Sequence, residues 1–375
     1  MATGASKDLV RLALAGGAFL GLACNHTDPF STPPYGTTQP FDPTPPVRLT
    51  LNEAADRGAS WLPDGSGILY SSRQEGRRDG DVCLAELPPT GGSQRRLVCD
   101  LTPAGIDSTN AIEWPVVGPG GRLAFVKASG ARQAVSPIQA AVAVASGLDP
   151  TTAVDVQPIP YTIPGEPRHS AVTQLRWLPD GRLIFVGGQV VYRAPGVGLP
   201  LDTLVSGLKL VVLDPVTPSA AVLPGTDFAT GVTPGLSSDE IFYTVGGDTR
   251  VFRLVLSSGE VSVLHDFGTA GIARDLHLAG SRLAAIVGGR VVFSADPDLG
   301  QMQWDSGGIV HVLDLSSGAD LALAGPGLFR RPALAPSADR VVAEGYPLII
   351  TQAPNQSVAD TTVARSGDLY LFELP

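Results

Sequence analysis

The sequence predicts an all-β protein built from a repeated four-stranded unit, and three observations lead to this expectation. Glycine (44 residues) and proline (33 residues) make up about a fifth of the 375 residues, where average usage is about 12%, and they follow no three-residue period. Short runs of alternating apolar and polar residues lie between them, and no segment has the periodicity of an amphipathic helix. The third observation is a turn motif that recurs along the chain.

The recurring motif predicts a tight turn between two antiparallel strands. It is clearest at 61–65 and 177–181, which both read Trp-Leu-Pro-Asp-Gly and both precede an apolar run. Proline presets φ for the first turn position, aspartate accepts hydrogen bonds from nearby N–H groups, and glycine adopts a positive φ. Weaker copies of the turn lie at 119–121, 237–239, 279–281 and 336–339.

The number and spacing of the turns predict the architecture. Six turns lie about 40 to 60 residues apart, which leaves room for four strands in each unit and predicts a six-bladed β-propeller. Segment 47–51 precedes the first turn without a blade of its own, whereas 368–374 has the pattern of a third strand in the last blade. We expect these two segments to pair and close the ring. Two β-sandwiches, the competing fold, would explain neither the repeat nor the orphan strand.

The turn motif resembles the repeat of TolB-type propellers, extracytoplasmic relatives of the WD-repeat blade with an aromatic-x-Pro-Asp-Gly signature. The resemblance covers about residues 47–375 and is strongest in the first and third units, although Leu62 and Leu178 replace the serine usual before Pro-Asp-Gly. TolB itself carries a smaller α/β domain before its propeller, and this chain has only a proline-rich segment there. The resemblance therefore implies a relative of TolB rather than TolB itself. Such a protein would be exported and would bind protein partners in the bacterial cell envelope.

The N-terminal segment predicts export. An apolar run over 12–23 follows two basic residues, and its length suits a signal peptide (~7–15 apolar residues) but not a membrane-spanning helix (~20). We expect a signal peptide over 1–23. Cys24 then stands first, as in a lipoprotein anchored to a membrane surface, although the leucines do not match a lipobox fully; cleavage by an ordinary signal peptidase would give a soluble periplasmic or secreted protein.

The next segment is predicted to be a tether. Seven prolines lie between residues 25 and 46, among Thr, Ser, Gly and Asp, and such a composition cannot bury a core. The domain organisation is therefore a signal peptide (1–23), an anchor cysteine with a proline- and threonine-rich tether (24–46), and the propeller (47–375).

The two remaining cysteines, Cys83 and Cys99, are expected to form a disulfide. They flank a turn centred on Gly91 at equal distances, which places them opposite each other in a hairpin. An exported protein permits such a bond. Two buried free thiols remain the alternative.

Loop length predicts which face of the propeller binds. Connections between second and third strands share one face, and five of them are long; the fourth unit has a short one near 246–250. Loops of this length are usually functional or disordered, so we expect the binding surface on this face. The five long connections are 71–80, 128–137, 187–207, 294–307 and 346–367.

Two of these loops contain the candidate binding residues. The first is a charge cluster suited to an acidic partner, or else a solvated loop tip. The second combines carboxylates with an aromatic ring, which suits Ca²⁺, stacking on a ligand ring, or a structural loop with a half-buried tryptophan. The candidates are Arg73, Glu75, Arg77, Arg78, Asp79, Asp296, Asp298, Gln301, Trp304 and Asp305.

Charge and missing motifs exclude other functions. A net charge of −10 and a pI near 4.9 argue against nucleic-acid binding. No histidine pair has metal-ligand spacing, and we expect His277, in the repeat position of Trp61 and Trp177, to pack within a blade. No Gly-x-Ser-x-Gly elbow is present. Glu113 and Asp275 fall on predicted inner strands without a visible partner.

We therefore expect a non-enzymatic envelope lipoprotein that acts as a protein-binding scaffold through its long-loop face. The expected site contains no catalytic residues, no cofactor apart from the Ca²⁺ alternative, and no metal ligands. A glycan- or small-ligand-binding propeller is the alternative, with Trp304 as a stacking platform. A metal-assisted hydrolase at the mouth of the tunnel is a second alternative.

Overall fold

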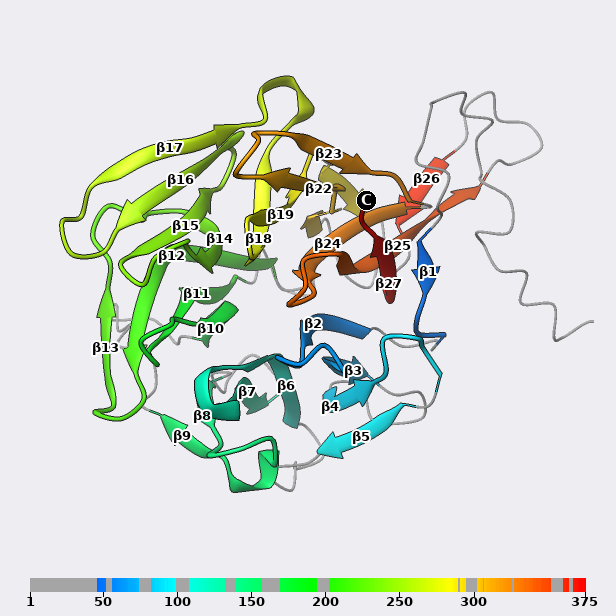
Figure 1. Ribbon diagram of the computed structural model, residues 1–375. Coiled ribbons are helices and arrows are strands. Elements are labelled where there is room, and N and C mark those ends of the chain that lie inside the picture. Colours follow the sequence, from blue (N-terminus) through cyan, green and yellow to red (C-terminus); the bar gives the residue numbers. More distant parts are fainter. Residues whose placement is uncertain are drawn as a thin grey trace, which may run out of the picture. The chain divides into compact units, whose positions relative to one another are not determined.

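The structure is a computed structural model in which the described part of the chain forms a ring of small β-sheets (Figure 1). The described residues are 46–51, 56–73, 82–92, 94–98, 108–131, 139–156, 169–193, 202–288, 291–294, 302–305, 307–325, 327–351, 360–363 and 367–375. The expected signal peptide, Cys24 and nearly all of the tether lie outside them. Among these residues no helix has the length and apolar character needed to span a membrane.

Six antiparallel sheets surround a common axis, which confirms the predicted six-bladed propeller with four strands in each blade (Figure 1). In the first three blades the strands, from the centre outward, are β2 (Asp56–Trp61), β3 (Ile68–Arg73), β4 (Val82–Leu87) and β5 (Arg95–Val98); β6 (Ser108–Val117), β7 (Leu123–Ala131), β8 (Gln139–Val144) and β9 (Val154–Val156); and β10 (His169–Trp177), β11 (Leu183–Arg193), β12 (Asp202–Asp214) and β13 (Ser219–Val222).

The other three blades follow the same order. Their strands are β14 (Ala229–Pro234), β15 (Glu240–Val245), β16 (Arg250–Val255) and β17 (Val261–Asp266); β18 (Ala273–Ala279), β19 (Arg282–Val287), β22 (Ile309–Asp314) and β23 (Asp320–Leu323); and β24 (Gly327–Leu334), β25 (Arg340–Thr351), β27 (Asp368–Glu373) and β1 (Val47–Arg48). Helical structure among the described residues is limited to three single turns of 3₁₀ helix.

The ring closes as predicted, because the last blade takes its outer strand from the start of the propeller. Val47 pairs with Leu371 and Arg48 pairs with Tyr370. Two contacts of Asp368 strengthen this closure: its carboxylate lies 2.6 Å from Arg48 Nη2 and accepts a hydrogen bond of 3.2 Å from Thr50 Oγ1. The first and last strands are therefore joined by backbone pairing, an ion pair and side-chain hydrogen bonds.

The long connections between second and third strands contain more strand than the sequence suggested. In the third blade, β11 and β12 remain paired as far as Arg193 and Asp202, so most of 187–207 is an extended hairpin rather than a loop. The fifth and sixth blades add β20 (Val291–Ser294), β21 (Met302–Asp305) and β26 (Asp360–Val363) in the corresponding connections. The reason is local: these segments continue the pairing of the blade strands. The connection of the fourth blade is short, as predicted.

The tryptophans of the turn motif join neighbouring blades. Trp61 Nε1 donates to the carbonyl of Ala333 at 2.9 Å, and Trp177 Nε1 donates to the carbonyl of Val116 at 3.2 Å. The indole of Trp177 covers Gly118 so closely that a Cβ at that glycine would collide with the ring. The aromatic residue of the repeat thus packs between blades and satisfies a buried N–H group.

Every innermost strand has a bulge at a similar height in the ring. Each of the six pairings between a first and a second strand shifts its register by one residue there. In five blades a residue at the bulge has a positive φ between 48° and 65°: Gly58, Trp114, Gln174, Asp275 and Arg331. Bulges redirect side chains, and these ones place a set of polar residues around the axis of the ring.

Candidate functional site

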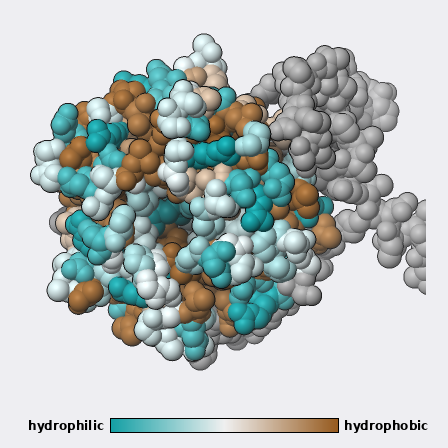
Figure 2. Space-filling view, in the orientation of Figure 1, coloured by the Kyte–Doolittle hydropathy of each residue, from teal (hydrophilic) through white to brown (hydrophobic). Residues whose placement is uncertain are grey.

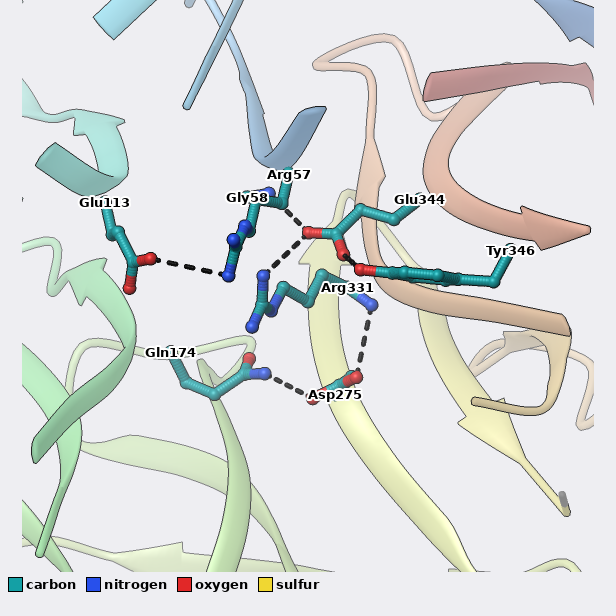
Figure 3. A network of polar contacts seen from close by, with 8 residues as sticks. All are labelled: Arg57, Gly58, Glu113, Gln174, Asp275, Arg331, Glu344 and Tyr346. Atoms are coloured by element: carbon teal, nitrogen blue, oxygen red, sulfur yellow. Dashed lines mark hydrogen bonds and ion pairs between the residues drawn. The ribbon is translucent and has the colours of Figure 1, made fainter. Parts of the chain in front are cut away.

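A polar network lies around the axis of the propeller, where the inner strands bulge. Figure 3 shows side chains from five blades converging on one region, and Figure 2 shows that the surface is hollowed in the middle of the ring, with hydrophilic residues in its depth. The four non-glycine residues with positive φ at these bulges are strained conformers that L residues seldom adopt. Strain of this kind at converging positions is typical of functional sites.

Glu344, on β25, organises one half of this network. Its side chain is fully buried and accepts three hydrogen bonds: from the backbone N of Gly58 at 2.5 Å, from Arg331 Nη1 at 2.9 Å and from Tyr346 Oη at 2.9 Å (Figure 3). Burial acts to lower the pKa of Arg331, but the Glu344 carboxylate and neighbouring groups outweigh it and raise that pKa. Burial and then Glu344 also raise the pKa of Tyr346. Arg331 is therefore a fixed cation and Tyr346 a neutral hydrogen-bond donor.

Asp275 connects three blades in the other half. Its carboxylate accepts hydrogen bonds from Gln174 Nε2 at 2.5 Å and from the backbone N of Arg331 at 3.1 Å. Arg57 Nη1 lies 3.6 Å from Glu113 Oε1 and links the first two blades. Each contact spans a blade boundary, so the network both holds the ring together and fixes the positions of its own charges (Figure 3).

Two aromatic rings cover the arginines of the network. The guanidinium of Arg331 lies 4.6 Å from the ring centre of Trp114, and that of Arg330 lies 4.8 Å from the ring centre of Tyr346. Cation–π contacts of this kind orient a guanidinium without neutralising it. The arginines therefore keep their charge and part of their hydrogen-bonding capacity.

Some hydrogen-bonding groups of the network have no partner in the described part of the structure. They are the Nε atoms of Arg57 and Arg330 and the Oε1 atom of Gln174, all buried. Unsatisfied buried polar atoms are uncommon in folded proteins and cost free energy, so a set of them at one place indicates a ligand or bound water. The two Nε atoms are hydrogen-bond donors, and Oε1 of Gln174 is an acceptor.

Most of the candidate loop residues fall outside the described residues. This applies to Glu75, Arg77, Arg78, Asp79, Asp296, Asp298 and Gln301. Arg73 ends β3, and Trp304 and Asp305 lie in β21, which pairs with β20; only their backbone is described. The structure therefore does not test these side chains, and their roles remain predictions.

Of the two cysteines predicted to form a disulfide, the structure describes only Cys83. Cys83 is buried in β4, and its neighbour Leu84 pairs with Val98 of β5. Cys99 lies outside the described residues, so the disulfide remains a prediction. Among the described residues, no group of three or more His, Cys, Asp or Glu side chains has the arrangement of a metal site. Metal and cofactor binding also remain untested.

The sequence pointed to only two residues of this network. Glu113 and Asp275 do lie on inner strands, and the structure supplies the partners that the sequence did not show. Gln174, Arg331 and Glu344 were missed. Gln174 and Arg331 lie three residues before the ends of their strands, as Gly58 lies before Trp61, and this offset from the turn motif was an available signal.

Comparison with solved structures supports the fold. The structure is similar to a gluconolactonase from Xanthomonas campestris (TM-score 0.53, 15% identity, covering 91% of this chain and 99% of that chain) and to a luciferin-regenerating enzyme (TM-score 0.51, 14% identity, 87% and 94%). TolB from Acinetobacter baumannii is also similar (TM-score 0.46, 14% identity, 85% and 63%), so this chain spans less than two thirds of that TolB chain. No protein-family model and no curated protein matches the sequence. These likenesses show the fold alone.

The expectation that the protein is not an enzyme is wrong. Two structures with this fold are a gluconolactonase and a luciferin-regenerating enzyme, so the fold gives no ground for excluding catalysis. The missing Gly-x-Ser-x-Gly elbow excludes only one type of hydrolase. In a propeller the groups of a central site come from separate blades, and they therefore show no characteristic spacing in the sequence.

Proposed function

We propose that the protein binds a small hydroxyl-rich ligand or substrate, of the carbohydrate type, in the polar network at the centre of the propeller. The observation that carries this proposal is the coexistence of fixed donors and acceptors with buried hydrogen-bonding atoms that have no partner among the described residues: Nε of Arg57, Nε of Arg330 and Oε1 of Gln174. Hydroxyl groups both donate and accept, so they match such a mixed set better than a purely anionic or cationic ligand does.

The network is also preorganised for binding. Glu344 and Asp275 hold their neighbours through hydrogen bonds of 2.5 to 3.1 Å, and these contacts come from several blades at once. A ligand would not have to order these side chains on binding, which reduces the entropic cost. A site built on strands also holds its geometry better than one built on loops.

A glycan array followed by calorimetry tests this proposal. We expect the wild-type protein to bind a subset of mono- or oligosaccharides, and Arg57→Met and Glu113→Gln to weaken that binding at least tenfold. Both side chains are about 30% exposed, so the variants should fold. Arg182→Met is the matched control, because Arg182 pairs with Asp180 in the exposed turn between β10 and β11. Unchanged saccharide affinity in both Arg57→Met and Glu113→Gln, or no binding by the wild type, would refute the proposal.

The long-loop face, formed by the connections between second and third strands, supports a second candidate function: binding of a protein partner in the cell envelope. The connections between second and third strands extend as paired strands in the third, fifth and sixth blades. Extended hairpins on one face offer a large, shaped contact area around the channel. Replacing 71–80 and 294–307 with short turns should remove a partner recovered from the cell envelope; recovery of the same proteins by wild type and variant would contradict this candidate. Loss of glycan-array binding in Trp304→Ala, with partners unchanged, would assign that ring to a ligand instead.

We also propose that the protein is exported and anchored through a lipid on Cys24. The support is the sequence alone: a signal-like segment followed directly by this cysteine. Cys24→Ala should move the protein from the membrane fraction to the soluble fraction, and an unchanged distribution would contradict the anchor.

A further inference from the structure

A cavity of about 240 Å³ lies at the end of the inner strands marked by the turn motif, beyond the bulges that carry the polar network. All six innermost strands, or the turns that follow them, contribute to its wall. Pro63 and Pro336, which follow two of these strands, are exposed at its rim. The polar wall residues are Ser60, Arg176, Thr233 and His277, whereas the others are apolar; no aspartate or glutamate of the described part of the chain lines the cavity.

Among the described residues, Arg176 is the only charged one in this wall. Its side chain is nine-tenths buried, with 7% of the residue exposed, and its guanidinium donates to two backbone carbonyls, those of Leu175 at 2.9 Å and Leu276 at 3.3 Å. Among the described residues its Nε has no hydrogen-bond partner and its guanidinium forms no ion pair, although Asp275 is near enough to attract it. Arg331, by contrast, has the carboxylate of Glu344 at 2.9 Å. A buried cation without a counter-ion is costly, and proteins retain one mainly where a ligand supplies the missing charge.

The burial of Arg176 also affects its pKa. Burial lowers the pKa of Arg176 to about 10, and the attraction of Asp275 offsets this only in part. The arginine remains charged at neutral pH, so the cavity presents one net positive charge in a chain whose formal net charge is −10.

His277 and Thr233 add neutral hydrogen-bond donors. The register of β18 puts Leu278, and not His277, in the position of Trp61 and Trp177, because Leu278 pairs with Leu283 as Trp177 pairs with Leu183. His277 therefore lies one residue before the repeat position that the sequence assigned to it, and its imidazole lines the cavity, as Trp61 and Trp177 do.

The hydrogen bonds of these two side chains define what they offer to a ligand. His277 Nδ1 accepts from the backbone N of Leu334 at 3.2 Å, so the neutral ring carries its proton on Nε2. Thr233 Oγ1 accepts from the backbone N of Leu278 at 3.0 Å and keeps its own proton to donate. Both groups can therefore donate to an acceptor in the cavity, as the guanidinium of Arg176 can.

We propose that this cavity binds a small organic monocarboxylate, with its carboxylate on Arg176 and its apolar body against Trp61, Trp177 and the neighbouring aliphatic side chains. One positive charge with neutral donors matches one negative charge, whereas a phosphate dianion would leave a charge uncompensated among apolar walls. The volume suffices for a compact body, since a cavity of about 150 Å³ accepts benzene. This site is independent of the proposed carbohydrate site. It consists of other residues, and it lies at the ends of the inner strands rather than at their bulges.

Calorimetric titration of the full chain with acetate, butyrate and benzoate tests the proposal, with benzamide and inorganic phosphate as probes of charge and shape. We expect butyrate or benzoate to bind at least tenfold more tightly than benzamide and phosphate, and to raise the melting temperature. Arg176→Met should abolish the preference for carboxylate over amide. Arg182→Met, which removes an exposed arginine, should keep it. Equal binding of benzoate and benzamide, or no binding of any monocarboxylate by the wild type, would overturn the proposal.

The stability of the variant separates a binding role from a structural one. If Arg176 is kept for a ligand, Arg176→Met should melt without ligand at or above the temperature of the wild type, because an uncompensated buried charge is removed. If the hydrogen bonds to Leu175 and Leu276 are its purpose, the variant should melt well below the wild type. A clearly lower melting temperature, together with an unchanged melting temperature of the wild type in benzoate, would show that Arg176 is structural and that the proposal is wrong.

Discussion

Glu344 is the residue on which most of the central network depends. Its carboxylate is buried and serves Gly58, Arg331 and Tyr346 at the same time. Truncation would leave Arg331 as an unpaired buried charge and two further donors without an acceptor. We therefore expect Glu344→Ala to reduce the free energy of unfolding by about 3–5 kcal/mol, the range found when a buried pair is broken. Urea denaturation measures this change.

The control for Glu344 is a surface pair of the same chemistry. Glu86 accepts from Arg95, whose side chain is 72% exposed. Exposed ion pairs contribute about 0–1 kcal/mol, so Glu86→Ala should cost less than about 1 kcal/mol. Similar losses in both variants would mean that the network around Glu344 does not act as a buried unit.

His277 predicts a dependence of stability on pH. Burial, reinforced by the positive charge of Arg176, lowers the pKa of His277 to about 3. The unfolded chain binds a proton on this ring near pH 6.5, whereas the folded chain does so only near pH 3. The unfolded state therefore takes up more protons between these values, and stability falls as pH drops through this window.

The measurement is the urea midpoint between pH 8 and pH 4 for the wild type and for His277→Gln. We expect the wild type to lose several kcal/mol that the variant does not lose, at roughly 1.4 kcal/mol per pH unit inside the window. At pH 8 the histidine is neutral in both states, so any difference there reports only the altered packing. Parallel pH profiles for the two proteins would contradict a buried neutral imidazole.

At the level of the strand and turn, the contact between Gly118 and Trp177 explains why the motif holds blades together. A Cβ at Gly118 would collide with the indole, which itself donates to Val116. We expect Gly118→Ala to cost about 1–3 kcal/mol through overpacking. Gly147→Ala is the matched control, since no atom lies within 4 Å of a Cβ at that position, and it should change stability by less than about 0.5 kcal/mol. Thermal unfolding of both variants gives the comparison, and equal stabilities would show that the blades adapt to the added methyl group.

The elements also show what the sequence could and could not predict. The blades were predictable because the Trp-Leu-Pro-Asp-Gly turns are local: Asp64 accepts from the backbone N of Ser66 at 3.0 Å, and Asp180 from that of Arg182 at 3.0 Å. The bulges were not predicted, because their one sequence signal is the offset of Gln174 and Arg331 from the ends of the inner strands, and neither residue type favours a positive φ. His277 is displaced by one position for another reason: the turn after β18 is one residue shorter than the turn after β10, since Leu278 pairs with Leu283 whereas Trp177 pairs with Leu183. The central site consists of residues brought together by these bulges, so the sequence revealed only Glu113 and Asp275.

At the scale of the molecule, charge is distributed unevenly. The chain has a formal net charge of −10, yet the inner strands carry more arginines than acids around the axis. The arginines on these strands are Arg57, Arg176, Arg274, Arg330 and Arg331, whereas the acids are Asp56, Glu113 and Asp275. A positive channel in an acidic protein concentrates small anions at its mouth, because low-dielectric walls focus the field. Weaker carboxylate binding at high ionic strength is the corresponding expectation.

The ring as a whole depends on its closure, and Asp368 is the side chain that most directly tests it. This residue is 4% exposed and contacts Arg48 of β1 and Thr50, which follows β1, so removing its carboxylate weakens the attachment of a guanidinium and a hydroxyl to the last blade. We expect Asp368→Ala to lose about 2–4 kcal/mol and, more specifically, to increase hydrogen exchange in β1 and β27 before the other blades. Asp339→Ala, which removes an exposed partner of Arg340, should leave exchange in these strands unchanged. A uniform increase of exchange in all six blades would mean that the propeller unfolds as one unit and that its closure is not the point at which it opens.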